Sequence, residues 1–372
     1  SNFTYFLEDP VNGDEFEQVD SRLYYGGALR HDRPINDRLV LRAGLDFRRD
    51  DISDIGLFRT AGRQRLSTVR RDEVTETSLA AWAEADYALT DTLRAVAGLR
   101  ADYYDADVTA ISLPVNGGTA DDTLLSPSLA LAWRATPDLE LYANYGEGFH
   151  SNDVRGATIR VDPTDDSPAS RVPILVKAKG SELGARWEKG TLRATLAVFQ
   201  LDLDSELVFV GDGGSTEPND ASSRTGVEAS LFWAPVDWLV LDAGGAFTDA
   251  RFDISSPDDE IPGAVENVLS AGALFRLGDL SLSSRLRHFG EASLIEDGSI
   301  TSEPTTIVNL GATYDWGQLS VSLDLFNALD AEDADITYFF ASRLLGEATA
   351  TEDIHFHPVE PRQLRASIRY RF

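Results

Sequence analysis

The last eleven residues of the chain read Arg362-Gln-Leu-Arg-Ala-Ser-Ile-Arg-Tyr-Arg-Phe372. From Leu364 to Phe372 every second side chain is apolar, and the side chains between them are polar or positively charged. Because successive side chains of a β-strand point to opposite faces, this segment presents one apolar and one polar face. Such a strand, ending on an aromatic residue, is typical of a transmembrane β-barrel, in which one face meets lipid and the other a polar lumen.

The same alternation recurs along the chain. Between residues 93 and 103 every odd position is Leu, Ala or Tyr, whereas Arg94, Arg100 and Asp102 lie at even positions. We therefore predict an all-β fold, a transmembrane antiparallel β-barrel with about 15 strands. The predicted strands span residues 22–31, 38–50, 74–88, 93–109, 124–136, 139–148, 179–189, 191–210, 224–235, 238–251, 266–277, 280–289, 305–316, 318–326 and 361–372.

Short and long connections alternate between these strands. Outer-membrane barrels have short turns on the periplasmic side and long loops on the extracellular side. A soluble β-sandwich has the same alternation of side chains but rarely this regular asymmetry of loop length. The short links are residues 32–37, 90–91, 136–138, 189–190, 235–237, 278–279 and 316–317, and the long ones are 51–73, 110–123, 149–178, 211–223, 253–265, 290–304 and 327–360.

The composition limits the possible functions. The 372 residues suffice for one large all-β domain, and the absence of cysteine excludes disulfides, thiolate metal sites and cysteine nucleophiles. A net charge of −29 argues against nucleic acid, whose phosphates would be repelled. It fits an acidic surface facing water, whose role is solubility in the first place and attraction of cations in the alternative. No apolar run approaches the roughly 18 residues of a membrane helix, but barrel strands carry a weaker signal.

The strand count and the start of the sequence predict an incomplete barrel. Complete bacterial barrels normally have an even number of strands, so an odd count implies that at least one strand is missing on the N-terminal side. The chain has no methionine and no signal peptide, which also suggests a processed chain or a fragment.

Three segments resemble the TonB-dependent receptors of Gram-negative outer membranes. They are Leu141-Tyr-Ala-Asn-Tyr-Gly-Glu-Gly-Phe-His-Ser-Asn-Asp-Val-Arg-Gly156, Leu323-Asp-Leu-Phe-Asn-Ala-Leu-Asp330 and Asp353-Ile-His-Phe-His-Pro-Val-Glu-Pro-Arg362. The resemblance implies a 22-stranded barrel filled by an N-terminal plug, of which residues 1–372 form a single barrel domain with the last 15 strands. The plug, the TonB-binding segment and about seven strands are expected outside these residues.

The resemblance also implies a function. The expected role is TonB-dependent uptake of a scarce ligand, such as a ferric siderophore or cobalamin, in the Gram-negative outer membrane. The expected partners are outer-membrane lipid, a small nutrient ligand and the barrel-assembly machinery, with TonB-ExbB-ExbD reached only through the absent N-terminal region. No cofactor and no enzymatic activity are expected. The alternative is a passive porin-like channel, which lacks a plug.

Several long links contain candidate ligand-binding residues. His150, Asn152, Asp153 and Arg155 open the link at 149–178, and loops on a rigid scaffold often carry function. Loop-capping hydrogen bonds are the alternative role for these four side chains. Two further candidates for ligand contact, Tyr338 and Arg343, lie in the link at 327–360.

One spacing permits a weak metal site. Asp353, His355 and His357 share a face of an extended segment and could ligate a metal or a metal chelate. The alternative is packing of this loop on the barrel rim, because a fourth ligand is missing. No Gly-x-Ser-x-Gly nucleophile elbow is present, so no catalytic residues are predicted.

Two more groups of residues carry expectations. If the resemblance holds, Tyr370 and Phe372 belong to the signal that the barrel-assembly machinery reads. Arginines on the predicted inner face are expected to pair with acidic side chains in the lumen. They are Arg42, Arg94, Arg100, Arg186, Arg193, Arg285, Arg287, Arg365 and Arg369.

Overall fold

A computed structural model of the chain describes residues 2–5, 14–210, 215–218, 220–342 and 347–372. Within these ranges sixteen strands form one antiparallel sheet, ordered β1-β2-β3-β4-β5-β6-β7-β8-β9-β12-β13-β14-β15-β16-β17-β20. The strands of this sheet are β1 (Asn2–Tyr5), β2 (Asp14–Asn36), β3 (Leu39–Ala61), β4 (Gln64–Ala88), β5 (Leu93–Ala110), β6 (Gly118–Thr136), β7 (Leu139–Ser151), β8 (Leu175–Lys189), β9 (Leu192–Leu203), β12 (Ser222–Val236), β13 (Leu239–Phe252), β14 (Asn267–Leu277), β15 (Leu280–Phe289), β16 (Thr305–Trp316), β17 (Leu319–Phe326) and β20 (Gln363–Tyr370).

Two hairpins stand outside this sheet, and the helices are short. The hairpins are β10 (Leu207–Val210) with β11 (Ser215–Pro218), and β18 (Ala334–Ser342) with β19 (Thr351–Pro358). The helical segments are η1 (Pro114–Asn116) and α1 (Val154–Thr158). Among the residues that the structure describes, no helix is long and apolar enough to cross a membrane.

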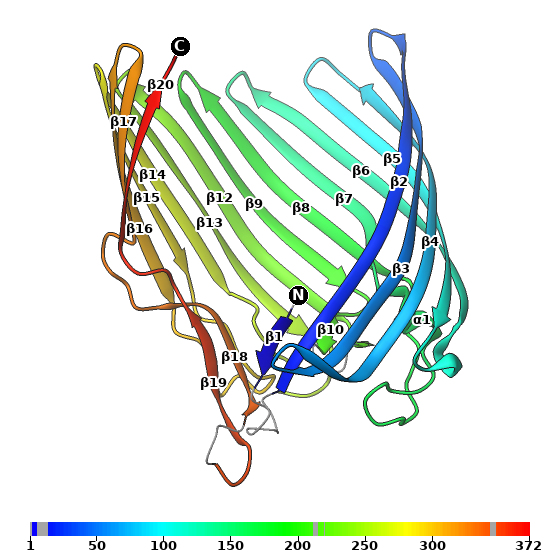
Figure 1. The fold of residues 1–372 in the computed structure, drawn as a ribbon. Helices are drawn as coiled ribbons and strands as arrows, with labels where there is room; N and C mark the ends of the chain where they lie inside the picture. Colours follow the sequence, from blue (N-terminus) through cyan, green and yellow to red (C-terminus); the bar gives the residue numbers. More distant parts are fainter. Residues whose placement is uncertain (1, 6–13, 211–214, 219, 343–346) are drawn as a thin grey trace.

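The sheet is strongly curved, so that β2 and β20 face each other across an open side (Figure 1). Tight turns join the strands at one end, which we call the turn end and where the C-terminus lies. The long connections, with α1 and the β18–β19 hairpin, lie at the opposite end, which we call the loop end. The predicted alternation of short and long connections is therefore confirmed except between β3 and β4, where a two-residue turn replaces the expected long link. The fifteen strands from β2 to β20 in this sheet match the predicted ones, and the four-residue β1 is additional.

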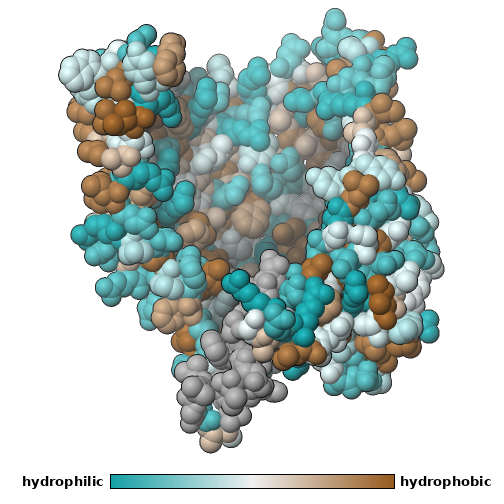
Figure 2. Space-filling model, viewed as in Figure 1, coloured by the Kyte–Doolittle hydropathy of each residue, from teal (hydrophilic) through white to brown (hydrophobic). Residues whose placement is uncertain are grey.

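The outer face of the sheet is apolar and uncovered. Figure 2 shows hydrophobic side chains along both outer flanks and many hydrophilic ones in the hollow between them. No second sheet of the described residues covers the outer face, so the β-sandwich alternative is wrong. An apolar surface of this extent is not stable in water and requires an apolar surrounding. More than half of the side-chain surface is exposed at Leu45, Leu99, Leu125, Leu183 and Leu196.

The inner face carries paired charges, and six of the nine predicted arginines form ion pairs; within the described ranges Arg287, Arg365 and Arg369 form none. Arg42 contacts Glu84 at 2.6 Å and Asp86 at 3.0 Å. Arg365 instead stacks over the ring of Phe326, with its guanidinium carbon 4.8 Å from the ring centroid. The other pairs are Arg94–Asp86, Arg100–Asp46, Arg186–Glu140, Arg193–Glu188 and Arg285–Asp242.

One predicted loop is in fact a hairpin. The link at 51–73 was expected to be irregular, but β3 runs to Ala61 and β4 starts at Gln64. The two residues between them, Gly62 and Arg63, have φ of 53° and 62°, which is the conformation of a type I′ turn. Both faces of this extension carry polar groups, so the polar–apolar alternation that identifies the other strands is absent here.

Other predicted boundaries also shift. The first long strand begins at Asp14 and ends at Asn36 rather than spanning 22–31, and the strand expected at 191–210 ends at Leu203. The link at 327–360 contains the β18–β19 hairpin instead of an irregular loop. The N-terminal part of β2 and the β18–β19 hairpin lie at the loop end, where the polar–apolar alternation of the other strands no longer marks a strand.

Candidate functional site

The long connection between β7 and β8 folds into the hollow at the loop end. Residues 152–174, which include α1, pack on the inner face of β3, β4 and β5. A buried apolar cluster holds this connection in place, since removing such side chains from water stabilises the contact by about 25 cal/mol per Å². The cluster consists of Ile52, Val74, Ala106, Val108, Val154, Ala157, Ile174 and Leu175.

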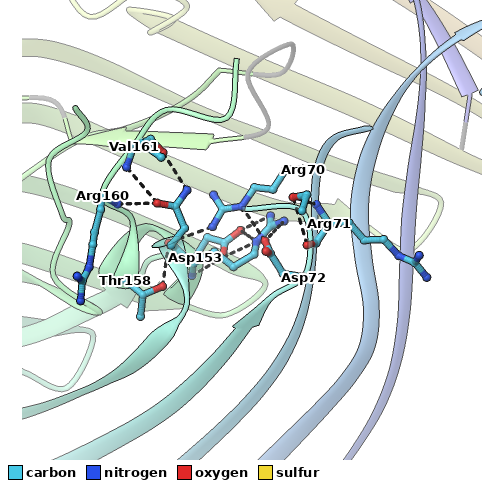
Figure 3. Close-up of polar contacts among 10 residues, drawn as sticks. Arg70, Arg71, Asp72, Asp153, Thr158, Arg160 and Val161 are labelled. Atoms are coloured by element: carbon cyan, nitrogen blue, oxygen red, sulfur yellow. Dashed lines mark hydrogen bonds and ion pairs between the residues drawn. The ribbon is translucent and has the colours of Figure 1, made fainter. Parts of the chain in front are cut away.

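A charge cluster of Arg70, Asp72, Asp153 and Arg155, buried except for the partly exposed Asp153, lies beside this apolar contact (Figure 3). Arg70 Nε lies 2.7 Å from Asp72 Oδ2, and both side chains are at most 3% exposed. Arg155 Nε donates to both carboxylate oxygens of Asp153, at 3.0 and 2.9 Å, and its Nη1 lies 3.8 Å from Asp72 Oδ2. Arg70 Nη2 also donates to the main-chain oxygen of Arg155 at 3.2 Å, which ties β4 to α1.

The two arginines keep the Asp153 carboxylate charged. Burial alone raises the pKa of Asp153, but the charge and hydrogen bonds of Arg155, with the charge of Arg70, hold that pKa below its ordinary value. Burial likewise acts to lower the pKa of Arg155, yet Asp153 and Asp72 raise that pKa overall. Asp153 and Arg155 therefore both stay charged at neutral pH, whereas burial lowers the pKa of Arg70 below its ordinary value.

Asn116 in η1 fixes the far end of the same connection. Its Oδ1 accepts hydrogen bonds from the main-chain nitrogens of Arg160 and Val161 at 2.9 and 3.0 Å, and its Nδ2 donates to Val161 O at 2.9 Å. The side chain is 1% exposed. Three bonds from one buried amide hold the connection in a single conformation, because breaking them would leave buried polar groups without partners.

The four residues predicted at 150–155 lie at this site, but two of them face the protein. Asn152 and Arg155 are buried, and Asn152 Nδ2 donates to Pro173 O at 2.7 Å. Asp153 accepts from the main-chain nitrogen of Arg155 at 2.9 Å and so caps α1. His150 lies in β7, and its buried Nε2 has no hydrogen-bond partner among the described residues. These contacts match the loop-capping alternative, and contact with a ligand stays a prediction.

The sequence prediction missed Arg70, Asp72 and Asn116. A spacing of two between Arg and Asp was a usable signal, because it places both side chains on one face of a strand. Figure 3 shows the result at β4, where Arg70 joins the cluster while the adjacent Arg71 points away from it. Ion pairs with this spacing occur at Asp20/Arg22, Arg30/Asp32, Arg48/Asp50, Arg49/Asp51, Arg70/Asp72, Arg100/Asp102, Asp153/Arg155 and Asp249/Arg251.

A cavity of about 330 Å³ lies at the loop end, next to the base of the β18–β19 hairpin. Tyr338, a predicted ligand-binding residue, lines this cavity and is 59% exposed. The other predicted residue of this link, Arg343, lies outside the described residues. The rest of the lining is Gly263, Val265, Phe289, Gly290, Ala292, Leu294, Ser302, Glu303, Thr305, Ile307, Ala334, Asp335, Ile336 and Thr337.

The weak metal candidates do not converge. His355 packs on the ring of Phe340, with centroids 3.8 Å apart, whereas His357 Nδ1 lies 2.7 Å from Asp335. Asp353 Oδ1 accepts from the main-chain nitrogen of Ile354. Within the described ranges no three His, Asp or Glu side chains form a group that could hold a metal ion. A shared strand face did not bring these side chains together, because His355 and His357 contact different residues of β18 and Asp353 accepts from its own strand.

The C-terminal aromatic residues lie at the turn end. The rings of Tyr370 and Phe372 contact edge to face, with centroids 5.1 Å apart. Tyr370 Oη donates to Gln318 Oε1 at 2.9 Å, and Phe372 is fully exposed. Both residues are thus accessible, Tyr370 as the last paired residue of β20 and Phe372 two positions beyond it.

Comparison with known proteins agrees with this architecture. The family model described as "TonB dependent receptor-like, beta-barrel" matches residues 1–328. Among solved structures, the chain is similar to the ferric yersiniabactin uptake receptor FyuA from Yersinia pestis, with a TM-score of 0.74 and 14% identity. The alignment covers 96% of this chain and 55% of FyuA.

Two further structures give the same result. The ferric-catecholate import receptor Fiu from E. coli K12 aligns with a TM-score of 0.72 and 15% identity, over 97% of this chain and 56% of Fiu. The ferric preacinetobactin receptor BauA from Acinetobacter baumannii aligns with a TM-score of 0.66 and 17% identity, over 96% of this chain and 55% of BauA. The chain thus spans about half the length of each of these proteins.

These similarities confirm the predicted fold class and the predicted resemblance. Strands with an apolar outer face and a charge-paired inner face, joined alternately by tight turns and long connections, form the barrel architecture of that family. The family consists of outer-membrane receptors and transporters of Gram-negative bacteria, not of enzymes. The chain belongs to the TonB-dependent receptor family, as part of its β-barrel.

Proposed function

We propose that this barrel belongs to a receptor that takes up a scarce nutrient ligand, such as a ferric siderophore or cobalamin, across the Gram-negative outer membrane with energy from TonB. Family membership is the observation that carries the proposal. The barrel residues do no covalent chemistry. They provide the wall of the transport path and the surface at the loop end that first meets the ligand.

The arrangement of the inner wall supports this role. Paired charges on the inner face, such as Arg42 with Glu84 and Arg100 with Asp46, give a polar wall along which a hydrated or polar solute can pass. At the loop end, the connection at 152–174 is folded inward and the cavity beside Tyr338 is open to ligand. Rigid strands thus present structured connections, which is how many binding sites are built.

Uptake by the whole gene product tests the proposal. Cells with and without TonB would express the protein and receive ⁵⁵Fe-labelled ferric citrate, a ⁵⁵Fe-labelled catecholate siderophore and ⁵⁷Co-labelled cobalamin. We expect at least one label to accumulate only when TonB is present. Equal entry of small sugars in both strains, with no TonB-dependent label, would instead establish the passive porin-like channel.

Deletion of Phe372 tests the proposed contact with the barrel-assembly machinery. The aromatic end of the last strand is exposed and therefore accessible to another protein. We expect the deleted chain to reach the outer membrane at a level several-fold below that of the unaltered chain, measured by heat-modifiable mobility on gels. A Phe372→Tyr variant retains an aromatic end and is the matched control. Equal insertion of the deleted chain and the control would exclude this role.

A further inference from the structure

We infer that the cavity beside Tyr338 binds an apolar or aromatic group that carries a positive charge. This inference rests on the proposed function and names the chemical class of its ligand. The cavity lies at the loop end, between the start of β16, the base of β18 and the connections at 253–265 and 290–304. Its volume of about 330 Å³ falls within the usual range for small-molecule sites, roughly 300–1,000 Å³.

Hydrogen bonds between the walls make the cavity a preformed one. Thr305 Oγ1 donates to Ala334 O at 2.5 Å, which joins β16 to β18. The two ends of the connection at 290–304 are hydrogen-bonded to each other, because Ser302 N donates to Ala292 O at 2.9 Å. Gly263 N donates to Ser293 O at 2.7 Å and ties the two connections together. A cavity held in this way loses little entropy when a ligand enters.

The lining offers apolar contact and one aromatic face. Leu294 and Ala292 are buried in the floor, and Phe289 and Ile336 are partly exposed. Tyr338 is more than half exposed, so its ring is accessible to a ligand. A quaternary ammonium or guanidinium group is attracted electrostatically to the face of such a ring.

The charged groups of the lining are all negative. Glu303 and Asp335 line the cavity, and the lining includes no Lys or Arg from the described residues. Asp335 pairs with His357, but Glu303 is exposed and has no ion pair or hydrogen bond among the described residues. One carboxylate is therefore available to a cationic ligand.

The connections that surround the cavity also carry a net negative charge. Residues 253–265 and 290–304 together contain eight Asp or Glu and no Lys or Arg, and residues 327–360 contain eight Asp or Glu and one Arg. The β3–β4 hairpin differs, since residues 48–77 contain seven Arg and six Asp or Glu. The negative potential is thus concentrated around the cavity, where it attracts cations and repels anions such as a carboxylate-rich chelate.

A matched pair of probes tests this charge preference. Benzyltrimethylammonium and benzenesulfonate each have one benzene ring and carry opposite charges. The whole gene product, in nanodiscs of zwitterionic lipid, would be titrated with each probe by saturation-transfer NMR. In 20 mM NaCl we expect the cation to bind at least tenfold more tightly than the anion. In 500 mM NaCl the difference should shrink, because salt screens exposed charges.

Two variants locate the binding to this cavity. We expect Glu303→Gln to weaken binding of the cation about threefold to fivefold, and Tyr338→Ala to weaken it about tenfold. Glu296→Gln is the matched control, because Glu296 is an exposed acid of the same connection that does not line the cavity. It should change affinity less than twofold. Glu303 is also exposed, so its variant leaves the fold intact even if Tyr338→Ala does not.

Equal binding of the two probes, or unchanged affinity in Glu303→Gln, would overturn the inference. These results are separate from the uptake measurement. TonB-dependent accumulation without selective cation binding would leave the transport function standing and exclude this cavity as a cation site. Selective binding without any TonB-dependent accumulation would support the site and contradict the proposed function.

Discussion

Replacement of Asp72 by alanine should weaken the docking of residues 152–174 by about 3–5 kcal/mol. Asp72 is 1% exposed and faces two arginines, Arg70 at 2.7 Å and Arg155 at 3.8 Å. Removing its carboxylate leaves Arg70 buried without an opposite charge, which costs far more than the loss of an exposed ion pair. Hydrogen exchange of the main-chain amides in residues 152–174 measures the free energy of local opening directly.

The neighbouring ion pair of Arg71 and Asp54 provides the control for this prediction. Arg71 lies 2.9 Å from Asp54, and both side chains are partly exposed to water. Arg71→Ala should change the opening free energy by less than about 1 kcal/mol, because solvent screens such pairs. Replacing Arg70 and Asp72 together by leucine should restore most of the docking, since neither charge then remains unpaired. Equal effects of Asp72→Ala and Arg71→Ala would contradict a buried charge cluster.

The substitution Ala143→Arg should destabilise the inserted barrel by about 2–4 kcal/mol, whereas Asn144→Arg should be tolerated. Ala143 lies mid-strand in β7 and pairs with Leu131 and Leu183, whose side chains are exposed on the outer face. Asn144 points to the inner face and is registered opposite Glu182, which can accept the new guanidinium. The two variants therefore differ mainly in the surroundings of the new charge, which are lipid at position 143 and the lumen at position 144.

Urea unfolding of the whole gene product from lipid vesicles measures this difference. The two variants carry the same charge change and differ in position by one residue, so each serves as the control for the other. Equal destabilisation by both, or a larger effect at position 144, would contradict the assignment of the outer face to lipid. A small effect at both positions would place this segment of β7 outside the hydrocarbon region.

Where lipid and lumen lie on opposite faces, the strands could be predicted from the sequence. Residues 93–103 illustrate this, because their odd positions are apolar and their even positions include Arg94, Arg100 and Asp102. The extension of β3 and β4 to Gly62 and Arg63 could not be found by the same criterion. Above the membrane both faces of that hairpin meet water or other connections, so composition no longer alternates.

The candidate site was predicted less completely than the fold. The segment at 150–155 was identified as a possible site, and Tyr338 does line a cavity, but the metal trio at Asp353, His355 and His357 is not assembled. Arg70 and Asn116 were missed. The spacing of Arg70 and Asp72 could have indicated their pairing, but the bonds of Arg70 to Arg155 and of Asn116 to Arg160 and Val161 join residues far apart in the chain, which the local sequence does not identify.

The sequence by itself determined the two-faced strands from β2 to β20 of the main sheet and, except between β3 and β4, the alternation of tight turns with long connections. Each follows from a local rule, namely that neighbouring side chains of a strand meet different surroundings. Only the tertiary structure decided which connection folds inward and which charges it buries. Arg70 and the carbonyl of Arg155 are 85 positions apart in the chain, and their contact exists only because the curved sheet brings β4 and α1 together.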